Sequence, residues 1–305
     1  MTTWGRTIRI YLAGGLPTGI RHAEIVNWTG QAVACPRARI GELVEWHEVA
    51  RPGVYFLLRS GFDTDAGIVY IGESEDVLSR VADHVKAKDF WTELVAITSK
   101  DQNLTKAHIR HLERRLILLA KEAGRYTLDN DNEPASVTLP RSESDAMEEF
   151  LDNIRIVLGT LGHRFLEPFS TMSTSAALED AENPLLGLRL SFPFKGLTAC
   201  GMQTDEGFLV LRGSEAVKVS VDSAPDHVLA LRDDAVAEGV LAEHDGHYLV
   251  TKDKLFGSPS TAAGFVSGWS KNGRDCWKDE RGRSLKDIED LVADSTQRGA
   301  VAVSA

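Results

Sequence analysis

The sequence is poor in the features that define several common classes of protein. Its three cysteines, Cys35, Cys200 and Cys276, lie far apart and form no CxxC pair, so neither a zinc site nor a disulfide framework is indicated. No apolar run approaches the roughly 20 residues that a membrane-spanning helix needs, and the first residues lack the apolar core of a signal peptide. We therefore expect a cytoplasmic protein with no membrane contact.

Positive charge is also scarce. The formal net charge is −11, which argues against a nucleic-acid partner because phosphate binding requires Lys and Arg. The acidic excess is concentrated in residues 131–250, which sum to −13, whereas residues 1–130 carry 17 basic and 16 acidic residues and residues 251–305 sum to +1. A near-neutral N-terminal part can still present a basic groove, so the net charge does not exclude DNA or RNA.

The chain is long enough to bury a substantial core. Its 305 residues are 43% hydrophobic and 26% charged, which is ordinary for a globular protein and suggests roughly two domains. We expect a β-rich lead-in over residues 1–48, packed on a main domain over 49–168, then a Ser/Ala/Thr-rich linker over 169–190 and a C-terminal domain over 191–305. In the lead-in we expect strands at Thr7–Leu12, Ala23–Trp28 and Gln31–Ala34 and a short helix at Ile40–His47.

A predicted hairpin opens the main domain. Two runs rich in β-branched and aromatic residues, Gly53–Leu58 (GVYFLL) and Gly67–Gly72 (GIVYIG), are joined by the polar, turn-forming residues 59–66. Each run holds one tyrosine, Tyr55 or Tyr70. A tyrosine in a strand most often serves packing, so neither residue alone indicates catalysis.

A helix is predicted directly after the hairpin, capped by Ser74 or Asp76. Its apolar residues share one stripe, and Arg80 and His84, four positions apart, lie beside each other along that stripe. Taken alone they indicate no more than a solvated arginine and a chance histidine. A third strand is predicted at Thr92–Thr98.

The strongest helix pattern follows at Lys106–Ala123, where Gly124 provides the stop. Glu113 projects beside the apolar stripe of this helix, where a carboxylate costs desolvation free energy unless something pairs with it. An ion pair and a ligand role are both open. A polar loop over residues 125–134 contains Asn130 and Asn132, and another amphipathic helix is predicted at Ser142–Leu161.

Together these residues resemble the GIY-YIG nuclease family. The resemblance rests on an ordered set: Gly53-Val54-Tyr55, Tyr70-Ile71-Gly72, Arg80 and His84 on the next helix, Glu113 on the long helix, and Asn130 or Asn132 in the following loop. The first motif has Val in place of Ile, and the gap between the motifs is long for the family. The resemblance implies an α+β fold in which a small three-stranded antiparallel sheet is flanked by helices, with a smaller mixed C-terminal domain in addition.

The resemblance also implies a chemistry, the metal-dependent hydrolysis of phosphodiester bonds in DNA. Glu113 would bind one Mg²⁺ or Mn²⁺ ion that keeps most of its waters. Arg80 would hold the scissile phosphate, and either Tyr55 or His84 would take the proton of the attacking water. Tyr70 would orient the water and the phosphate, and Gly72 would let the backbone turn tightly at the cofactor-binding part of the site.

Two other functions compete with this one. A catalytically silent nucleic-acid-binding or assembly module would keep the fold but lose Arg80 or Glu113, and both are present. A nuclease directed at RNA would keep the same residues.

The C-terminal part predicts strands, at Gly196–Cys200, Gly207–Leu211, Ala216–Val221 and His247–Thr251, around a helix at about Asp226–Glu238. Ser258 or Ser260 is expected to start a short helix, followed by a turn and an aromatic strand over Trp269–Trp277.

The segment from about Phe194 to Leu291 also resembles a small bacterial domain of uncharacterised function. Its aromatic and basic residues could stack on bases and contact phosphates, or could equally be core tryptophans with solvated charges. They are Trp269, Trp277, Lys271, Arg274, Lys278, Arg281 and Arg283.

Overall fold

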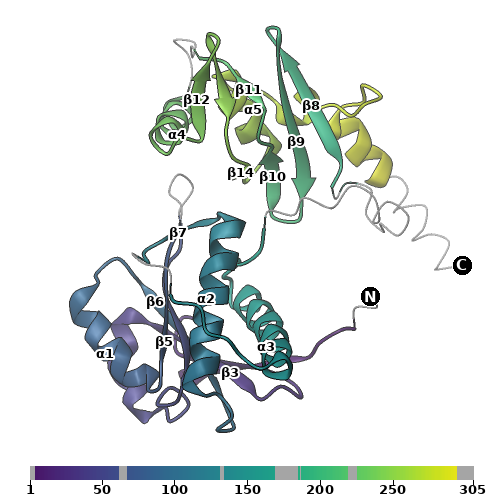
Figure 1. Ribbon diagram of the computed structural model, residues 1–305. Coiled ribbons are helices and arrows are strands. Elements are labelled where there is room, and N and C mark those ends of the chain that lie inside the picture. The colour runs from purple at the N-terminus through teal and green to yellow at the C-terminus, as the bar shows by residue number, and fades with distance from the viewer. Residues whose placement is uncertain are drawn as a thin grey trace, which may run out of the picture. The chain divides into compact units, whose positions relative to one another are not determined.

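The computed structural model describes residues 4–61, 67–130, 134–168, 185, 187–218 and 225–293. The chain divides into two compact units, Met1–Pro168 and Phe169–Ala305, and each is described by itself. Both combine helices with β-sheets, so the chain belongs to the mixed α+β class (Figure 1). Within the described residues no helix combines the length and apolarity needed to cross a bilayer.

The first unit is built on one seven-stranded sheet with the order β1-β2-β3-β6-β4-β5-β7. All neighbouring strands are antiparallel except β5 and β7, which are parallel. The strands are β1 (Ile8–Leu12), β2 (Arg21–Ile25), β3 (Gly30–Pro36), β4 (Gly53–Arg59), β5 (Gly67–Ser74), β6 (Glu93–Ser99) and β7 (Tyr126–Leu128).

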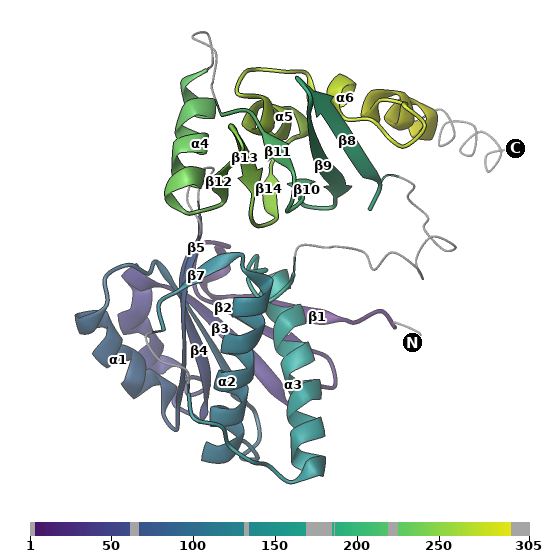
Figure 2. The same ribbon diagram turned by 45° about the horizontal axis from the view of Figure 1, so that its top comes forward.

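Helices cover both faces of this sheet (Figure 2). One face carries α1 (Val77–Ala87) and the 3-10 helix η2 (Arg37–Glu45), and their apolar residues pack with Tyr55 and Leu57. The other carries α2 (Lys106–Ala123) and α3 (Arg141–Thr160), which bury the larger core around Phe56. A short 3-10 turn, η1 (Ala13–Gly15), follows β1.

The predicted hairpin, the third strand and the three amphipathic helices of this unit are confirmed, with small shifts of their ends. Asp76 is the cap of α1, because its side chain accepts from the backbone N–H of Ser79. Helix α2 has the predicted bounds and ends at Gly124, whose φ of 62° is left-handed. The predicted helix at Ile40–His47 is the 3-10 helix η2.

The prediction of a three-stranded sheet is wrong, because the sheet has seven strands. The lead-in strands do not merely pack on the main domain, because β3 pairs with β6 along its whole length and extends the same sheet. Strand β7 adds a seventh member at the opposite edge. Such long-range pairing satisfies backbone groups that no local sequence pattern assigns.

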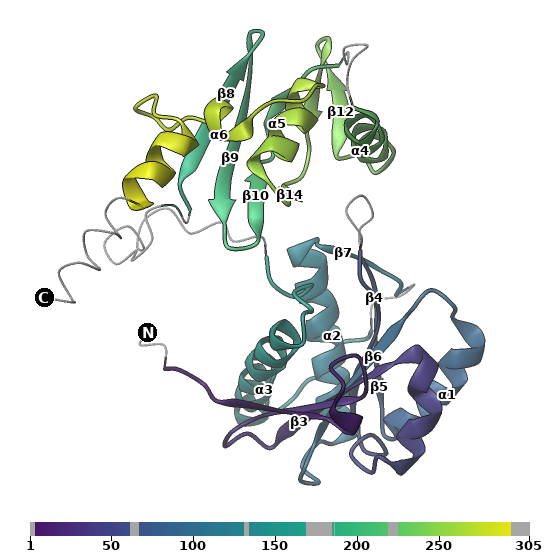
Figure 3. The same ribbon diagram turned by 180° about the vertical axis from the view of Figure 1, so that it is seen from behind.

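The second unit holds two smaller sheets (Figure 3), one with the order β14-β10-β9-β8 and one with the order β11-β13-β12. The strands are β8 (Arg189–Phe194), β9 (Leu197–Thr204), β10 (Gly207–Val210), β11 (Glu215–Ala216), β12 (Leu241–His244), β13 (His247–Val250) and β14 (Lys254–Phe256). The helices are α4 (Asp226–Ala237), α5 (Pro259–Ser267) and α6 (Gly273–Cys276), and residues 285–293 are also helical.

The expected aromatic strand at Trp269–Trp277 is wrong. Asn272 caps α6, accepting from the N–H of Arg274, so this segment turns into a short helix instead. Trp277 is 0% exposed and packs on Phe192 and Phe208 in the core of the unit. Strand β8, which supplies Phe192, begins before the first strand that the sequence predicted. Part of the predicted strand Ala216–Val221 lies outside the described residues.

Candidate active site

Two tyrosines and a histidine meet on the α1 face of the sheet. In the β4–β5 ladder, Tyr55 lies opposite Gly72 and Tyr70 lies opposite Leu57, which places both tyrosines on one face. The ring of His84, from α1, lies 5.7 Å from the Tyr55 ring and 5.0 Å from the Tyr70 ring between centroids. The three side chains that were predicted separately therefore form one aromatic cluster.

A hydrogen bond joins the two buried members of this cluster. The Tyr55 hydroxyl lies 2.8 Å from Nε2 of His84, and Tyr55 is only 1% exposed. Burial, followed by the neighbouring Tyr70, raises the pKa of Tyr55. Burial, followed by the charges of Arg80 and Lys88, lowers the pKa of His84. Both shifts favour the uncharged forms of the two groups near pH 7, so the hydrogen bond joins a neutral phenol and a neutral imidazole.

Gly72 makes room for this arrangement. A Cβ at this position would lie 2.4 Å from the hydroxyl oxygen of Tyr55, so the phenol ring rests directly on the glycine backbone. The expected tight turn is wrong, because Gly72 lies within strand β5 and its φ is not positive. The glycine is needed for the close approach of a neighbouring ring.

Arg80 adds positive charge at the exposed side of the cluster. It lies on α1 one turn before His84, and its side chain is exposed. The Tyr55 oxygen, by charge and by hydrogen bonding, raises the pKa of Arg80. Lys88, at the other end of the helix, holds its ammonium 4.5 Å from the centre of the Tyr70 ring and 2.5 Å from Asp129. The aromatic cluster is therefore flanked by two cations.

The second half of β5 forms a free edge. Strand β7 pairs only with Gly67–Val69, so among the described residues no strand lies beyond the part of β5 after Val69. Asn130 takes the place of a strand at Ile71: its Oδ1 accepts from the Ile71 N–H at 3.1 Å, and its Nδ2 donates to the Ile71 carbonyl at 2.8 Å. Of the two asparagines singled out by the sequence, Asn130 clamps the strand that carries Tyr70, and Asn132 lies outside the described residues.

Glu113 reaches the same edge from α2. Its carboxylate accepts from the backbone N–H of Glu73, the residue directly after Gly72. Burial, followed by the adjacent Glu73 carboxylate, raises the pKa of Glu113 to about 7. Lys106 and Arg110 contact Glu73, at 2.7 Å and 3.8 Å, and so neutralise one of the two carboxylates. Glu113 is left as an under-neutralised acid beside the sheet edge.

The structure thus links the aromatic cluster on one face with Glu113 on the other through two consecutive residues, Gly72 and Glu73. The sequence reasoning missed Glu73 and Lys88. Glu73 could have been suspected because it directly follows the Tyr-Ile-Gly motif, and Lys88 because it lies one helical turn beyond His84.

Glu113 and Glu73 offer carboxylate oxygens, the type of ligand that a hard cation takes. Within the described part of the chain no group of three or more His, Cys, Asp or Glu side chains converges as a complete protein cage would require. Mg²⁺ is commonly held by one or two carboxylates together with its own waters. Glu113 fits that pattern, since a divalent ion would supply the positive charge that this buried carboxylate lacks, next to Glu73.

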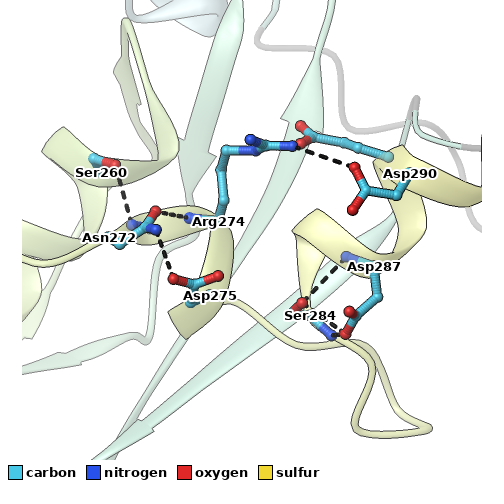
Figure 4. Close-up of polar contacts among 9 residues, drawn as sticks. Ser260, Asn272, Arg274, Asp275, Ser284, Asp287 and Asp290 are labelled. Atoms are coloured by element: carbon cyan, nitrogen blue, oxygen red, sulfur yellow. Dashed lines mark hydrogen bonds and ion pairs between the residues drawn. The ribbon is translucent and has the colours of Figure 1, made fainter. Parts of the chain in front are cut away.

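Three of the seven residues that the sequence offers for nucleic-acid contact in the second unit are engaged in contacts within the unit. Trp277 is buried and its indole N–H donates to the Pro259 carbonyl at 3.0 Å, so it cannot stack on a base. Arg274 is paired with Glu289 at 2.5 Å and with Asp290 at 3.9 Å (Figure 4). Arg283 is paired with Asp279 at 2.8 Å. Trp269 and Lys271 remain accessible in part.

Comparison with known proteins concerns the second unit. Residues 190–289 match a family described as a domain of unknown function (DUF4357). This region contains most of the segment whose sequence resembles an uncharacterised domain. No curated protein and no solved structure matches the chain. The match is a similarity over residues 190–289, and it carries no activity.

Proposed function

We propose that residues 49–168 form a metal-dependent endonuclease of the GIY-YIG type that hydrolyses phosphodiester bonds in DNA. The observation that carries the proposal is the Tyr55–His84 hydrogen bond beside Arg80. Tyr55 rests on Gly72, and Glu113 accepts from the N–H of the next residue, Glu73. The order of elements supports it, because β4, β5, α1, β6 and α2 follow one another as the family resemblance implies. The strands β6-β4-β5 lie side by side, with β4 central, inside the larger sheet.

Each side chain has a task in the proposed reaction. Arg80 is exposed and cationic next to Tyr55, so it can bind the scissile phosphate and stabilise the charge that develops on it. The Tyr55 hydroxyl, resting on Gly72, is the group that meets the attacking water. As the water loses its proton to the Tyr55 oxygen, the Tyr55 hydroxyl proton passes to Nε2 of His84 along their 2.8 Å hydrogen bond.

In this relay Tyr55 takes the proton from water and His84 takes the proton from Tyr55, so both candidates for the base take part. Tyr55 alone would be a poor base, because burial raises its pKa and disfavours the phenolate. His84 can accept the proton because its imidazole is neutral near pH 7, although burial and the charges of Arg80 and Lys88 lower its pKa. Glu113 would hold the divalent cation, which when bound supplies positive charge to the phosphate oxygens. Asn130 and Tyr70 keep β5 and the His84 ring in place.

The test is a nicking assay on supercoiled DNA with Mg²⁺ or Mn²⁺. We expect cleavage by the wild-type chain, and a loss of about 100-fold or more in Glu113→Gln and in Arg80→Ala without a change in folding. Lys86→Ala, which removes an exposed cation from α1, the helix that also carries Arg80, is the matched control and should retain most activity. An inactive wild type, or undiminished cleavage by Glu113→Gln, would overturn the proposal.

The substrate class is tested in the same assay. Duplex DNA and single-stranded RNA of equal length are offered in parallel, and preferential cleavage of RNA would replace DNA in the proposal. A chain that binds DNA but cleaves neither substrate with any divalent metal would be a silent binding module.

A further inference from the structure

A small aromatic and basic surface lies at the tip of the β8–β9 hairpin in the second unit. Phe194 ends β8, and Lys195 and Gly196 form a two-residue turn, since Phe194 pairs with Leu197 across the ladder. Both turn residues have left-handed backbone angles, with φ of 46° and 81°. The hairpin tip therefore presents Phe194 and Lys195 from a defined backbone.

Trp269 faces this tip from the end of α5. It directly follows the left-handed Gly268 that ends the helix, and the Ser267 hydroxyl donates to its backbone carbonyl at 3.1 Å. Its ring contacts that of Phe194 edge to face, with centroids 4.5 Å apart at 74°. Two independently fixed backbones thus hold two aromatic rings in one arrangement.

Two ammonium groups lie over the indole of Trp269. Nζ of Lys195 is 4.7 Å from the ring centre, and Nζ of Lys271 is 5.0 Å from it. Across the part of the chain that the structure describes, neither lysine forms an ion pair, in contrast to Arg274 and Arg283 nearby. Their charge is thus available to an anion, whereas that of the two arginines is already neutralised.

We propose that Trp269, Phe194, Lys195 and Lys271 form a binding platform for single-stranded nucleic acid. One unpaired base would stack on the indole, and the two lysines would move from the ring to the phosphates that flank the base. Duplex nucleic acid fits less well, because its bases are stacked on each other and unavailable to a protein ring. The proposal rests on the proposed nuclease function for its purpose, which is to bind the nucleic acid that the first unit cleaves.

The experiment measures binding of the full-length chain to a fluorescently labelled 12-nucleotide single strand and to a duplex of the same length, in EDTA so that no cleavage occurs. We expect the single strand to bind about tenfold or more tightly than the duplex. Trp269→Ala should weaken single-strand binding about tenfold or more, and Trp269→Phe should restore part of it.

A charge variant separates stacking from a folding defect. Lys195→Gln combined with Lys271→Gln leaves the rings in place. We expect the plot of log affinity against log salt to become less steep, with a slope smaller in magnitude by about 1.4, which corresponds to two lost phosphate contacts on a single strand. The matched control replaces two exposed lysines of the same unit, Lys252 and Lys286, by Gln and should leave both affinity and slope unchanged.

Equal affinity for the two nucleic acids, or an unchanged affinity and salt slope in the Lys195/Lys271 variant, would overturn the platform. Either result leaves the nicking assay untouched, because that assay depends on Glu113 and Arg80 in the other unit. Conversely, a chain that fails to nick DNA but shows the expected binding in EDTA would reject the nuclease proposal alone.

Discussion

At the scale of single residues, Tyr55 and His84 are best understood as one unit. A phenol buried to 1% exposure is difficult to ionise, and a buried imidazole between cations is difficult to protonate. Their 2.8 Å hydrogen bond satisfies both groups while they are neutral. In the proposed reaction Tyr55 passes its proton to His84 along this bond while it takes one from the water, so Tyr55 stays neutral and the positive charge forms on His84.

The relay predicts the outcome of Tyr55→Phe. The variant keeps the ring on Gly72 but removes the hydroxyl, so we expect cleavage to fall by about 100-fold or more, the usual size of a lost proton-transfer group. The buried Nε2 of His84 would also lose its partner, which costs about 1–3 kcal/mol of unfolding free energy. Single-turnover cleavage and urea denaturation measure the two effects.

Tyr70→Phe is the control for that variant, because its ring contacts with His84 and Lys88 are preserved. We expect it to retain far more activity than Tyr55→Phe. Equal activity in Tyr55→Phe and the wild type would exclude Tyr55 from the proton path and leave His84 to act directly on water.

At the scale of elements, β5 determines the site. One edge of the strand pairs with β4. The face that carries Tyr70 and Gly72 lies toward α1. The other edge is bound by Asn130 and by Glu113. The hairpin and the periodic helices were predictable because their signals are local: strand composition, an Asp cap at residue 76 and a glycine stop at residue 124.

The sequence could not predict residue roles that depend on contacts between distant segments. The role of Gly72 follows from the residue opposite it on β4, and the role of Asn130 from a strand almost sixty residues earlier. The sequence leaves both a stacking role and a core role open for Trp277, because its sequence neighbours are charged. Trp277 is core because β8, which was not predicted, covers it with Phe192.

The clamp on β5 predicts the effect of Asn130→Ala. Both hydrogen bonds to Ile71 would be lost, at a cost of about 1–3 kcal/mol, and the free edge would open more often. We expect faster amide hydrogen exchange at Ile71 and Glu73 and a lower kcat with little change in KM. Asn103→Ala, on an exposed turn, is the control and should change neither.

An unchanged exchange rate at Ile71 in Asn130→Ala would contradict the clamp. A changed KM with normal exchange would instead place Asn130 on the substrate.

At the scale of the whole molecule, each unit has its own core and its own stabilising polar contacts. In the first unit, Glu93 at the start of β6 joins three distant segments: it accepts from Arg21 of β2, and its other oxygen lies 2.9 Å from Nε2 of His163, after α3. His163 is only 4% exposed. This contact therefore connects the lead-in strands, the central sheet and the end of the last helix of that unit.

The Glu93 contact predicts how the first unit responds to acid. Burial alone would raise the pKa of Glu93, but His163 and Arg21 outweigh it, so the pKa lies below its ordinary value. A carboxyl group whose pKa is lower in the folded state contributes stability above its unfolded pKa of about 4.3, and loses it as the pH falls through the folded value. We expect the unfolding free energy of this unit to decrease below about pH 4.5, measured by urea denaturation between pH 7 and pH 3.

Glu93→Gln should lose about 1–3 kcal/mol of unfolding free energy at pH 7, and its stability should decrease less steeply with falling pH. Glu75→Gln, at an exposed acid, should follow the wild type. Because Glu93 belongs to the first unit, a transition of the second unit should not move. A variant with the wild-type slope would show that the three segments are held together by apolar packing alone.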